Sequence, residues 1–382
     1  MEHAQDSPRR WRMFRFDRRL IHYFDWVMLL FLVLVGTMGL ANLYSSTWNG
    51  GPHASVAFYK QLYILIFGLA FILPLVSFDY KELETLGFVF YGFVLLLLIY
   101  AAFFEHSVAG TQRWIDLGFF RLQPSELAKL ALVLVLASYF SRQEIGEGFG
   151  LLGLIKPAIL TAIPFVLIMI QPDLGTAMML AVIFCSMILF VKLRWSTIMV
   201  LGTLGGGAAV IFWKFFLKEY QRHRIETFLD PEGDPMNQGY QIMQSKIAVG
   251  SGQAFGKGFL EGTQGHLHFL PERHTDFAFS VWAEEWGFAG SAFFLGCYFL
   301  MLLWGINIAL TARDKFGAIL AFGLVMLIFW QAVINLLMIM GLLPVVGIPL
   351  PRFSYGGSSL LTTLFCIGLL MNIRMRRFQL KG

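Results

Sequence analysis

The sequence predicts an all-α integral membrane protein with about ten transmembrane helices, both termini lying in the cytoplasm, on three observations. Hydrophobic residues make up 57% of the chain and charged residues only 14%, and the mean hydropathy is +0.66. Apolar runs recur along the whole length, each close to the roughly 20 residues that a helix needs to cross the hydrocarbon core. They lack the roughly ten-residue alternating pattern of an outer-membrane barrel. A soluble globular fold is therefore excluded.

The positive charges gather at the ends of the chain and predict its orientation. Six arginines between residues 9 and 19 precede the first apolar run, and basic residues at 374, 376, 377 and 381 follow the last. Cytoplasmic segments of membrane proteins are rich in Lys and Arg, so both termini are expected inside, which requires an even number of spans. Nucleic-acid binding and a twin-arginine export signal fit less well, because long apolar runs adjoin the clusters and no small-residue cleavage site follows the first.

This orientation divides the chain into a basic cytoplasmic N-terminus (1–25), a polytopic membrane domain (26–373) and a basic cytoplasmic tail (374–382). Pro124 and Ser125 predict the start of the fourth span, with Ser125 as N-cap. The glycine run 205–207 predicts close helix packing or a bend, and the eighth span is long enough to tilt or break. The spans are expected at 26–46, 56–78, 86–104, 124–140, 154–170, 177–191, 197–216, 277–309, 318–340 and 360–373.

The longest polar region, residues 217–275, is expected outside the cytoplasm between the seventh and eighth spans. Loops of this length are usually functional or disordered, and the aromatic residues here favour short amphipathic helices. The region runs straight into the eighth span, so Asp276 lies where a polar loop enters a membrane helix. A carboxylate there can act as a general base or hold a divalent cation, but the helix macrodipole equally favours a structural acid. The neighbouring Glu272, Arg273 and His274 favour a chemical role.

A second candidate group contains Arg113, Glu126 and Lys129. Glu126 and Lys129 are three residues apart and share a helix face, as a surface ion pair would. Lys129 is expected in the first helical turn, however, where the dipole favours an anion, and this favours a position beside a bound phosphate. Asp173, in the motif QPDLGT, is either a turn residue or an acid at a membrane mouth. Lys246 in the long loop is either solvated or part of a phosphate-handling surface.

Other patterns carry less weight. Glu284 and Glu285 inside the eighth span imply partners or a wet cavity, with no role assigned. The histidines at 266, 268 and 274 match no zinc-binding spacing. The segment GSGQAFGKG lacks the lysine–serine ending and the preceding strand of a nucleotide-binding loop. The three cysteines lie in apolar runs and predict neither a disulfide nor a metal site. The segment 341–359, broken by prolines and glycines, must be buried in protein or line a wet cavity.

Six sequence blocks together carry a family signal: GTQRWI, QPSELAK, QPDLGTA, GYQ with QSKIAVGSG, FLPERHTDF with AEEWGF, and GLLPVVGIPLPRFSYGGSS. In this order and spacing they resemble the SEDS family (shape, elongation, division and sporulation), the integral-membrane peptidoglycan glycosyltransferases. FLPERHTDF, the AEE turn and the short tails are more similar to the rod-shape branch than to the division branch. Arg352 and Phe353 stand where the resemblance leads us to expect apolar residues.

The resemblance implies a polymerase that joins lipid II disaccharides into glycan strands on the outer face of the cytoplasmic (inner) membrane and releases undecaprenyl pyrophosphate. Asp276 matches the essential acid of the family and would be the general base for the acceptor 4-hydroxyl. Arg113, Glu126, Lys129, Asp173 and Lys246 would bind the substrate and its pyrophosphate, with a divalent cation (Mg²⁺ or Mn²⁺) as an optional addition. The implied partner is a class B penicillin-binding protein, the transpeptidase of the elongation machinery.

Three alternatives stay open on the sequence. A lipid II transporter would use Glu284, Glu285 and the broken segment before the last span for alternating access. A polymerase of the division-specific branch would share the chemistry. A non-catalytic scaffold for cell-wall enzymes is disfavoured, because polar groups at membrane depth are costly unless they have a function.

Overall fold

The computed structural model describes residues 23–377, apart from 49, 52, 105–112, 117, 119–120, 144–147, 216–218, 235–236 and 267–268. Side chains at 204, 208–215, 220, 265 and 266 are also not described. The N-terminal arginine cluster, Lys381, the first half of the GTQRWI block (110–112) and His268 therefore lie outside the described residues.

Long apolar helices occupy all the positions predicted for the spans. They are α2 (Trp26–Ser46), α3 (Val56–Ser77), α4 (Leu83–Phe104), α5 (Pro124–Ser141), α6 (Leu151–Ile170), α7 (Leu174–Phe190), α8 (Trp195–Phe215), α12 (Ala278–Leu310), α13 (Lys315–Ile339) and α14 (Gly357–Met375). Within the described residues, eight stretches are long and apolar enough to cross a membrane; α7 is shorter at 17 residues, and part of α8 has no described side chains. The all-α membrane fold is confirmed.

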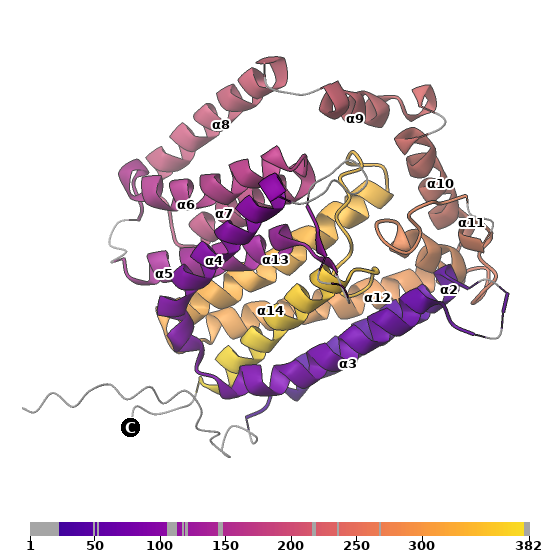
Figure 1. Cartoon of the computed structure of the whole chain (residues 1–382), viewed down its shortest axis with the longest axis horizontal. Coiled ribbons are helices and arrows are strands. Elements are labelled where there is room, and N and C mark those ends of the chain that lie inside the picture. Colours follow the sequence, from indigo (N-terminus) through magenta and orange to yellow (C-terminus); the bar gives the residue numbers. More distant parts are fainter. Residues whose placement is uncertain are drawn as a thin grey trace, which may run out of the picture.

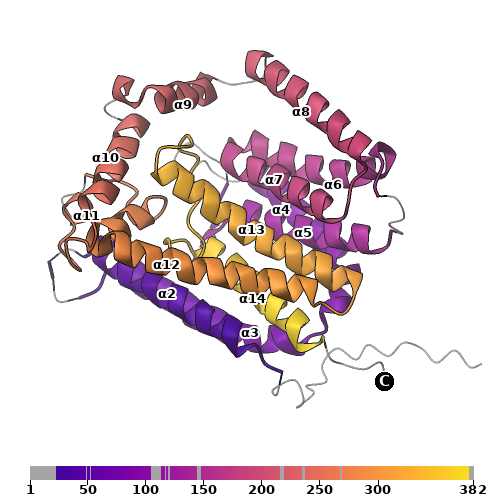
Figure 2. The ribbon, with the colours of Figure 1, turned by 180° about the vertical axis from the view of Figure 1, so that it is seen from behind.

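The helices α5 and α14 form the middle of the bundle. In each, 83% of the apolar window is buried, whereas α3, on the outside, buries only 22%. Small residues let the backbones approach: Gly323 of α13 lies against Val133 and Met187, and Gly68 of α3 lies against Leu364 of α14. Figures 1 and 2 show α12 and α13 crossing the molecule beside α14, with α2 and α3 along one edge. The candidate site residues are carried by this rigid bundle.

The helix α8 lies along the outside of the bundle, and α9 (Glu219–Leu229) and α10 (Gln238–Ser251) continue the arc toward the start of α12 (Figures 1 and 2). The short helices η2 (Pro231–Gly233) and α11 (Thr263–His266) belong to the same region, which confirms the short helices expected there. A Cβ atom added at Gly205, Gly206 or Gly207 would meet nothing within 4 Å among the described atoms. The close packing predicted for this glycine run is therefore wrong.

The turns predicted on the cytoplasmic side meet at one end of the bundle. The hydroxyl of Tyr80, in η1 (Tyr80–Glu82), donates to Asp314 at 2.5 Å, and Arg142 after α5 pairs with Glu84 at 3.4 Å. Backbone hydrogen bonds join Phe149 before α6 to the turn after α7. These contacts support the predicted alternation of the spans between two sides; which side is cytoplasmic stays a prediction.

The helix α12 is broken at Gly287, where φ is +62°, as its length predicted. The amide groups of Phe288 and Ala289 donate to the carbonyls of residues 253 and 254 instead of to the preceding turn. The carbonyls of Glu284 and Glu285 are thereby released and accept from the amides of residues 257 and 258. The glycine-rich segment 250–258 thus enters the break through its backbone, which explains its glycines without a nucleotide.

Glu284, whose role the sequence left unassigned, anchors the same loop. Its carboxylate is fully buried and accepts from Lys257 Nζ at 2.6 Å, from the amide and hydroxyl of Thr263 at 2.9 and 3.0 Å, and from the amide of Gln264. Glu285 beside it accepts a hydrogen bond from Ser45 of α2. Both acids therefore have structural partners.

We expect Glu284→Ala to loosen this loop because several donors lose their acceptor, each buried one at a cost of about 1–3 kcal/mol. Trypsin cleavage after Lys257 should then become at least tenfold faster while the rest of the chain stays intact. The exposed Glu261, in the same loop, supplies the matched control Glu261→Ala. Equal cleavage rates in the two variants would show that Glu284 does not hold the loop.

Candidate active site

Asp276 lies two residues before α12, and its carboxylate is not used as a helix cap. The N-cap of α12 is Phe277, whose side chain caps nothing. Three other aspartates at helix starts, at 25, 173 and 314, each accept a hydrogen bond from the helix they precede. Asp276 is therefore not a capping residue of α12, since its carboxylate accepts no hydrogen bond from the described part of the chain. It still lies at a helix start, where the macrodipole favours an acid.

The surroundings of Asp276 fix its backbone and leave its carboxylate facing a glycine. Asn335 of α13 donates from Nδ2 to the carbonyl of Asp276 and to that of Ile348, both at 2.8 Å. Gly347, with φ at +70°, approaches so closely that an added Cβ would lie 3.5 Å from Asp276 Oδ2. A residue with a Cβ at 347 would strain the backbone, because φ is positive there, and its Cβ would be in van der Waals contact with the carboxylate.

In the loop 340–356, residues 348 and 350–354 are buried in protein, whereas 340, 342 and Gly347 are exposed. The burial predicted for irregular backbone at membrane depth is thus found in the second half of the loop. The amide of Tyr355 donates to the carbonyl of His274 at 2.8 Å. This hydrogen bond joins the loop to the residues that precede α12. Arg352 is only 3% exposed; its Nη2 donates to the carbonyl of Leu32, while Nε and Nη1 find no partner among the described residues. At this position, where the family resemblance led us to expect an apolar residue, the contact with α2 is therefore a polar one.

Asp173 and Arg113, which are far apart in the sequence, meet beside Asp276. Asp173 is the N-cap of α7, accepting from the amide of Thr176 at 3.1 Å, and it also pairs with Arg113 at 3.7 Å. Gln123, the N-cap of α5, donates from Nε2 to the same carboxylate at 3.3 Å. Asp173 therefore caps a helix and also lies within the candidate site.

Four helix starts converge around these residues. The Gln123 amide donates to the hydroxyl of Ser358 at the start of α14, which joins the α5 and α14 ends, and the Asp173 contact adds α7. The charges of Arg113 and Asp173 both act on Asp276 at the start of α12. Helix N-termini carry partial positive charge, so four of them facing one place favour a bound anion. A small hairpin, β1 (Ile115–Asp116) with β2 (Arg121–Leu122), holds the connection to Arg113.

The electrostatic setting suits Asp276 to accept a proton near neutral pH. Burial, and to a smaller extent the negative charge of Glu272, raises the pKa of Asp276 to about 6, against the lowering by Arg113 and Arg224. A carboxyl group with a pKa close to the working pH is both available as a base and strong enough to take a proton. The charge of Arg224, on α9, acts on Asp276 from the long loop, whose basic residues the sequence left as either a solvated loop or a phosphate-handling surface.

Glu126 and Lys129 are paired at 2.7 Å and almost fully buried, at 4% and 1% exposure. The expectation of a surface ion pair is therefore wrong. The predicted start of α5 is also wrong. The N-cap is Gln123 rather than Ser125, and Pro124 is the first residue of the helix. Lys129 consequently lies in the second turn, beyond the strongest part of the helix dipole. Its charge acts on Cys366 of α14, which shows that the pair faces the middle of the bundle.

Lys246 and the histidines are not brought to Asp276 by any described contact. Lys246 is an exposed residue of α10, and the end of its side chain lies beside Gly341 at the end of α13. Within the described residues, no three His, Cys, Asp or Glu side chains are grouped so as to hold a metal ion.

Gln123, Asn335 and Gly347 are the site residues that the sequence did not reveal; a lone amide such as Asn335 in an apolar run was the one available signal.

Comparisons with known proteins place this arrangement in a family. The family of FtsW, RodA and SpoVE, described as cell cycle proteins, matches residues 23–379. The peptidoglycan glycosyltransferase MrdB of Escherichia coli K12 is 42% identical over 290 residues, which cover 76% of this chain and 78% of MrdB. The peptidoglycan glycosyltransferase RodA of Treponema pallidum is 34% identical, covering 93% of this chain and 98% of RodA.

Solved structures agree with the sequence relatives. A chain from a peptidoglycan synthase complex, described as coordinating polymerization and crosslinking, superposes with a TM-score of 0.78 at 34% identity, over 93% of this chain and 99% of that one. The rod shape determining protein RodA of Thermus thermophilus superposes with a TM-score of 0.69 at 29% identity, over 93% and 98% of the two chains. The chain belongs to the SEDS family, the family of FtsW and RodA.

Proposed function

We propose that this protein polymerises lipid II into glycan strands for cell elongation, with Asp276 as the general base. The observation that carries the proposal is a carboxylate with a pKa of about 6 that caps no helix and lies among four helix N-termini. The relatives named peptidoglycan glycosyltransferase supply the reaction class. The rod-shape branch is favoured over the division branch by the MrdB and RodA relatives, although a protein named as a probable FtsW is 36% identical.

In the proposed reaction, Asp276 takes the proton of the acceptor 4-hydroxyl as that oxygen attacks the anomeric carbon of the donor sugar. The bond from this carbon to the pyrophosphate oxygen breaks, and undecaprenyl pyrophosphate leaves. Negative charge grows on the leaving pyrophosphate, so cations and helix N-termini fixed beside it lower the barrier. Arg113 and the starts of α5, α7 and α14 are placed for this role, and Arg224 and Lys246 are candidates to reach it from the long loop.

A lipid II transporter has less support from the structure than from the sequence. Two observations favoured transport: a pair of intramembrane acids without an assigned role, and the broken segment before the last span. Glu284 instead anchors the loop 257–264, and Glu285 contacts Ser45. Acids with static structural partners give no reason to infer alternating access.

The same proposal implies the membrane in which the protein lies, the side on which Asp276 lies, and the partner protein. The apolar helices and the family establish a multi-pass membrane protein. We infer that it lies in the cytoplasmic membrane with Asp276 on the outer face, because the described basic residues at 374, 376 and 377 lie at the opposite end of α14 from Ser358. One structural relative comes from a complex that couples polymerization to crosslinking, and this supports a class B penicillin-binding protein as the partner of this chain.

The test is polymerisation of labelled lipid II by the purified protein with its transpeptidase partner, read as glycan ladders on a gel. We expect ladders that require the protein and stop when a non-hydrolysable lipid II analogue replaces the substrate. In parallel, proteoliposomes that carry fluorescent lipid II report translocation. Translocation without polymer would overturn the proposal in favour of a transporter.

The pH dependence of polymerisation should follow the ionisation of Asp276. Its pKa of about 6 predicts half-maximal rate near pH 6, a plateau above, and a fall of about tenfold per pH unit well below. Because the charge of Glu272 raises this pKa, Glu272→Gln should move the midpoint to lower pH; Arg224→Gln should move it higher. A midpoint unmoved by either variant would separate the pH profile from Asp276.

A divalent cation remains a proposal for this site. Asp276 and Asp173 offer carboxylate oxygens, which Mg²⁺ and Mn²⁺ prefer, and a bound pyrophosphate would complete the ligands. When bound, such a cation would neutralise charge on the leaving group. Chelation with EDTA should then lower the polymerisation rate at least tenfold, with recovery on adding Mg²⁺ or Mn²⁺; an unchanged rate would exclude a required cation.

A further inference from the structure

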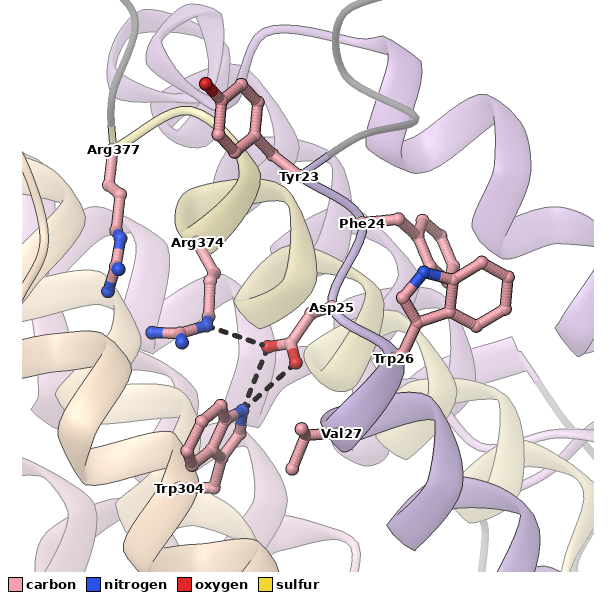
Figure 3. A pocket seen from close by; sticks show the side chains of 8 residues that line it. All are labelled: Tyr23, Phe24, Asp25, Trp26, Val27, Trp304, Arg374 and Arg377. Atoms are coloured by element: carbon pink, nitrogen blue, oxygen red, sulfur yellow. Dashed lines mark hydrogen bonds and ion pairs between the residues drawn. The ribbon is translucent and has the colours of Figure 1, made fainter.

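The position of the Asp276 carboxylate is set through the main chain of this residue. The buried Asp25 at the start of α2 is held differently, by partners of its side chain. Figure 3 shows its oxygens accepting from the indole nitrogen of Trp304, at 3.1 and 3.0 Å, with Arg374 Nε 3.5 Å away. The Asp276 carboxylate accepts no hydrogen bond from the described residues. Because a general base has to stay within reach of the hydroxyl that it deprotonates, the groups that hold the backbone of Asp276 determine its reach.

Asn335 of α13 is the side chain that holds this backbone. It is fully buried, and its Nδ2 donates to the carbonyls of Asp276 and Ile348, both at 2.8 Å. Only the nitrogen of an amide side chain can donate, and it carries two hydrogens. Both are used here, so the orientation of Asn335 is fixed. One buried amide therefore ties the residues that precede α12 to the loop that follows α13.

The tied part of the loop, residues 346–348, lies between the start of α7 and the carboxylate of Asp276. On one side, a Cβ atom added at Gly175 in the first turn of α7 would be 2.6 Å from the carbonyl oxygen of Val346, so the two backbones touch. On the other side, a Cβ atom added at Gly347 would be 3.5 Å from Asp276 Oδ2. A small shift of this segment therefore changes the space in front of the carboxylate.

A second hydrogen bond joins the same two parts of the chain, from the amide of Tyr355 to the carbonyl of His274 at 2.8 Å. It lies two residues before Asp276 and eight residues after Gly347, so it does not hold the one against the other. Without the amide of Asn335, the two carbonyls would lose their donor and turn toward water. The loop would stay attached, and its fit against the carboxylate would be lost.

We propose that Asn335 is a positioning residue for the general base: by bridging two carbonyls it keeps residues 346–348 fitted against Asp276, and so keeps the carboxylate within reach of the acceptor hydroxyl. This inference rests on the proposed function, because it concerns the same proton transfer. Asn335 itself exchanges no proton. A displacement of about 1 Å in a catalytic group can cost about a hundredfold in rate. The loss should appear in kcat and leave KM nearly unchanged, since Asn335 contacts none of the cations proposed to bind the substrate.

The test compares Asn335→Leu with Asn372→Leu in the polymerisation of labelled lipid II, with rates expressed per folded protein. Asn372 of α14 is the matched control. It is also fully buried, and its Nδ2 donates to the carbonyls of Leu75 and Phe78 at 2.7 and 2.6 Å. It lies 14 residues beyond Ser358, about 21 Å along the helix from the candidate site. Both variants should lower the unfolding midpoint, but only Asn335→Leu should lower kcat, by about a hundredfold, with KM within about twofold.

A second variant covers the case in which Asn335→Leu does not fold. Asn335→Gln keeps both donor hydrogens on a side chain that is longer by one methylene, so the carbonyls stay paired while the loop is held further from Asp276. We expect it to recover most of the unfolding midpoint and to keep kcat about tenfold or more below that of the wild type.

Three outcomes would count against the inference, and they are distinguishable. Equal losses of kcat in Asn335→Leu and Asn372→Leu, or a kcat of Asn335→Gln that recovers together with the midpoint, would leave Asn335 a structural role only. Glycan ladders from the wild type together with an unchanged kcat in Asn335→Leu would overturn the inference alone. No ladders from the wild type would overturn the proposed function, and the inference with it.

Discussion

Asp276→Asn is expected to abolish glycan polymerisation while the protein stays folded. General-base catalysis contributes about 10²–10⁴-fold, so the rate should fall by at least a hundredfold. The fold should survive, because the carboxylate accepts no hydrogen bond from the described residues and the contact from Asn335 goes to the backbone carbonyl. Asparagine has nearly the same shape and lacks only the charge and the ability to take the proton. The measurement is the initial rate of ladder formation, with the unfolding midpoint taken on the same preparation.

Asp173→Asn is the informative comparison, because the structure predicts the opposite balance. Asp173 caps α7 and pairs with Arg113; asparagine caps a helix about as well, so the loss of charge should lower stability only through the pair with Arg113, by about 1 kcal/mol or less. Its polymerisation rate should fall less than that of Asp276→Asn, since Asp173 does not take the proton. If Asp276→Asn kept a rate within tenfold of the wild type, the base would have to be sought elsewhere. If it unfolded, its role would be structural after all.

The spans could be predicted from the sequence because a membrane helix is recorded in a continuous apolar run. The length of α12 predicted that it would tilt or break, and the cost of exposed backbone in lipid predicted that residues such as 350–354 would be buried or line a wet cavity. Which residues meet was not foreseeable. Arg113 and Asp173 pair across 60 positions, and Glu284 accepts from Lys257 and Thr263, more than 20 positions away. A local pattern holds no information on such pairs.

The errors at α5 have a single physical origin. Ser125 is a good N-cap residue by propensity, but Gln123 begins the helix, since its amide is bound by Ser358 and its side chain by Asp173. These tertiary contacts outweigh a capping preference of about 1 kcal/mol. With the start moved by two residues, Lys129 lies in the second helical turn instead of the first. The helix dipole then gives no reason to place a phosphate beside Lys129. The charge of Lys129 is balanced instead by its buried partner Glu126.

Breaking the pair of Glu126 and Lys129 should have the largest effect on stability in this chain. Removing one member of a buried ion pair leaves an uncompensated charge and costs about 3–5 kcal/mol. Lys129→Met and Glu126→Gln are therefore each expected to be strongly destabilised in SDS titrations of the detergent-solubilised protein. Lys81→Met is the control, because Lys81 pairs with Asp314 at 3.6 Å but is 46% exposed, and exposed pairs contribute about 1 kcal/mol or less.

The double variant decides what the pair is for. With Glu126→Gln and Lys129→Met together, no unpaired charge remains, so most of the lost stability should return. If the pair only supports the packing of α5 against α14, polymerisation should return with it. A stable double variant that forms no glycan would instead show that Lys129 acts on the substrate, as its family position implies. Because Lys129 is 1% exposed and already 2.7 Å from a carboxylate, we expect the first result: the pair serves the bundle, and Arg113 with the helix N-termini serves the anion.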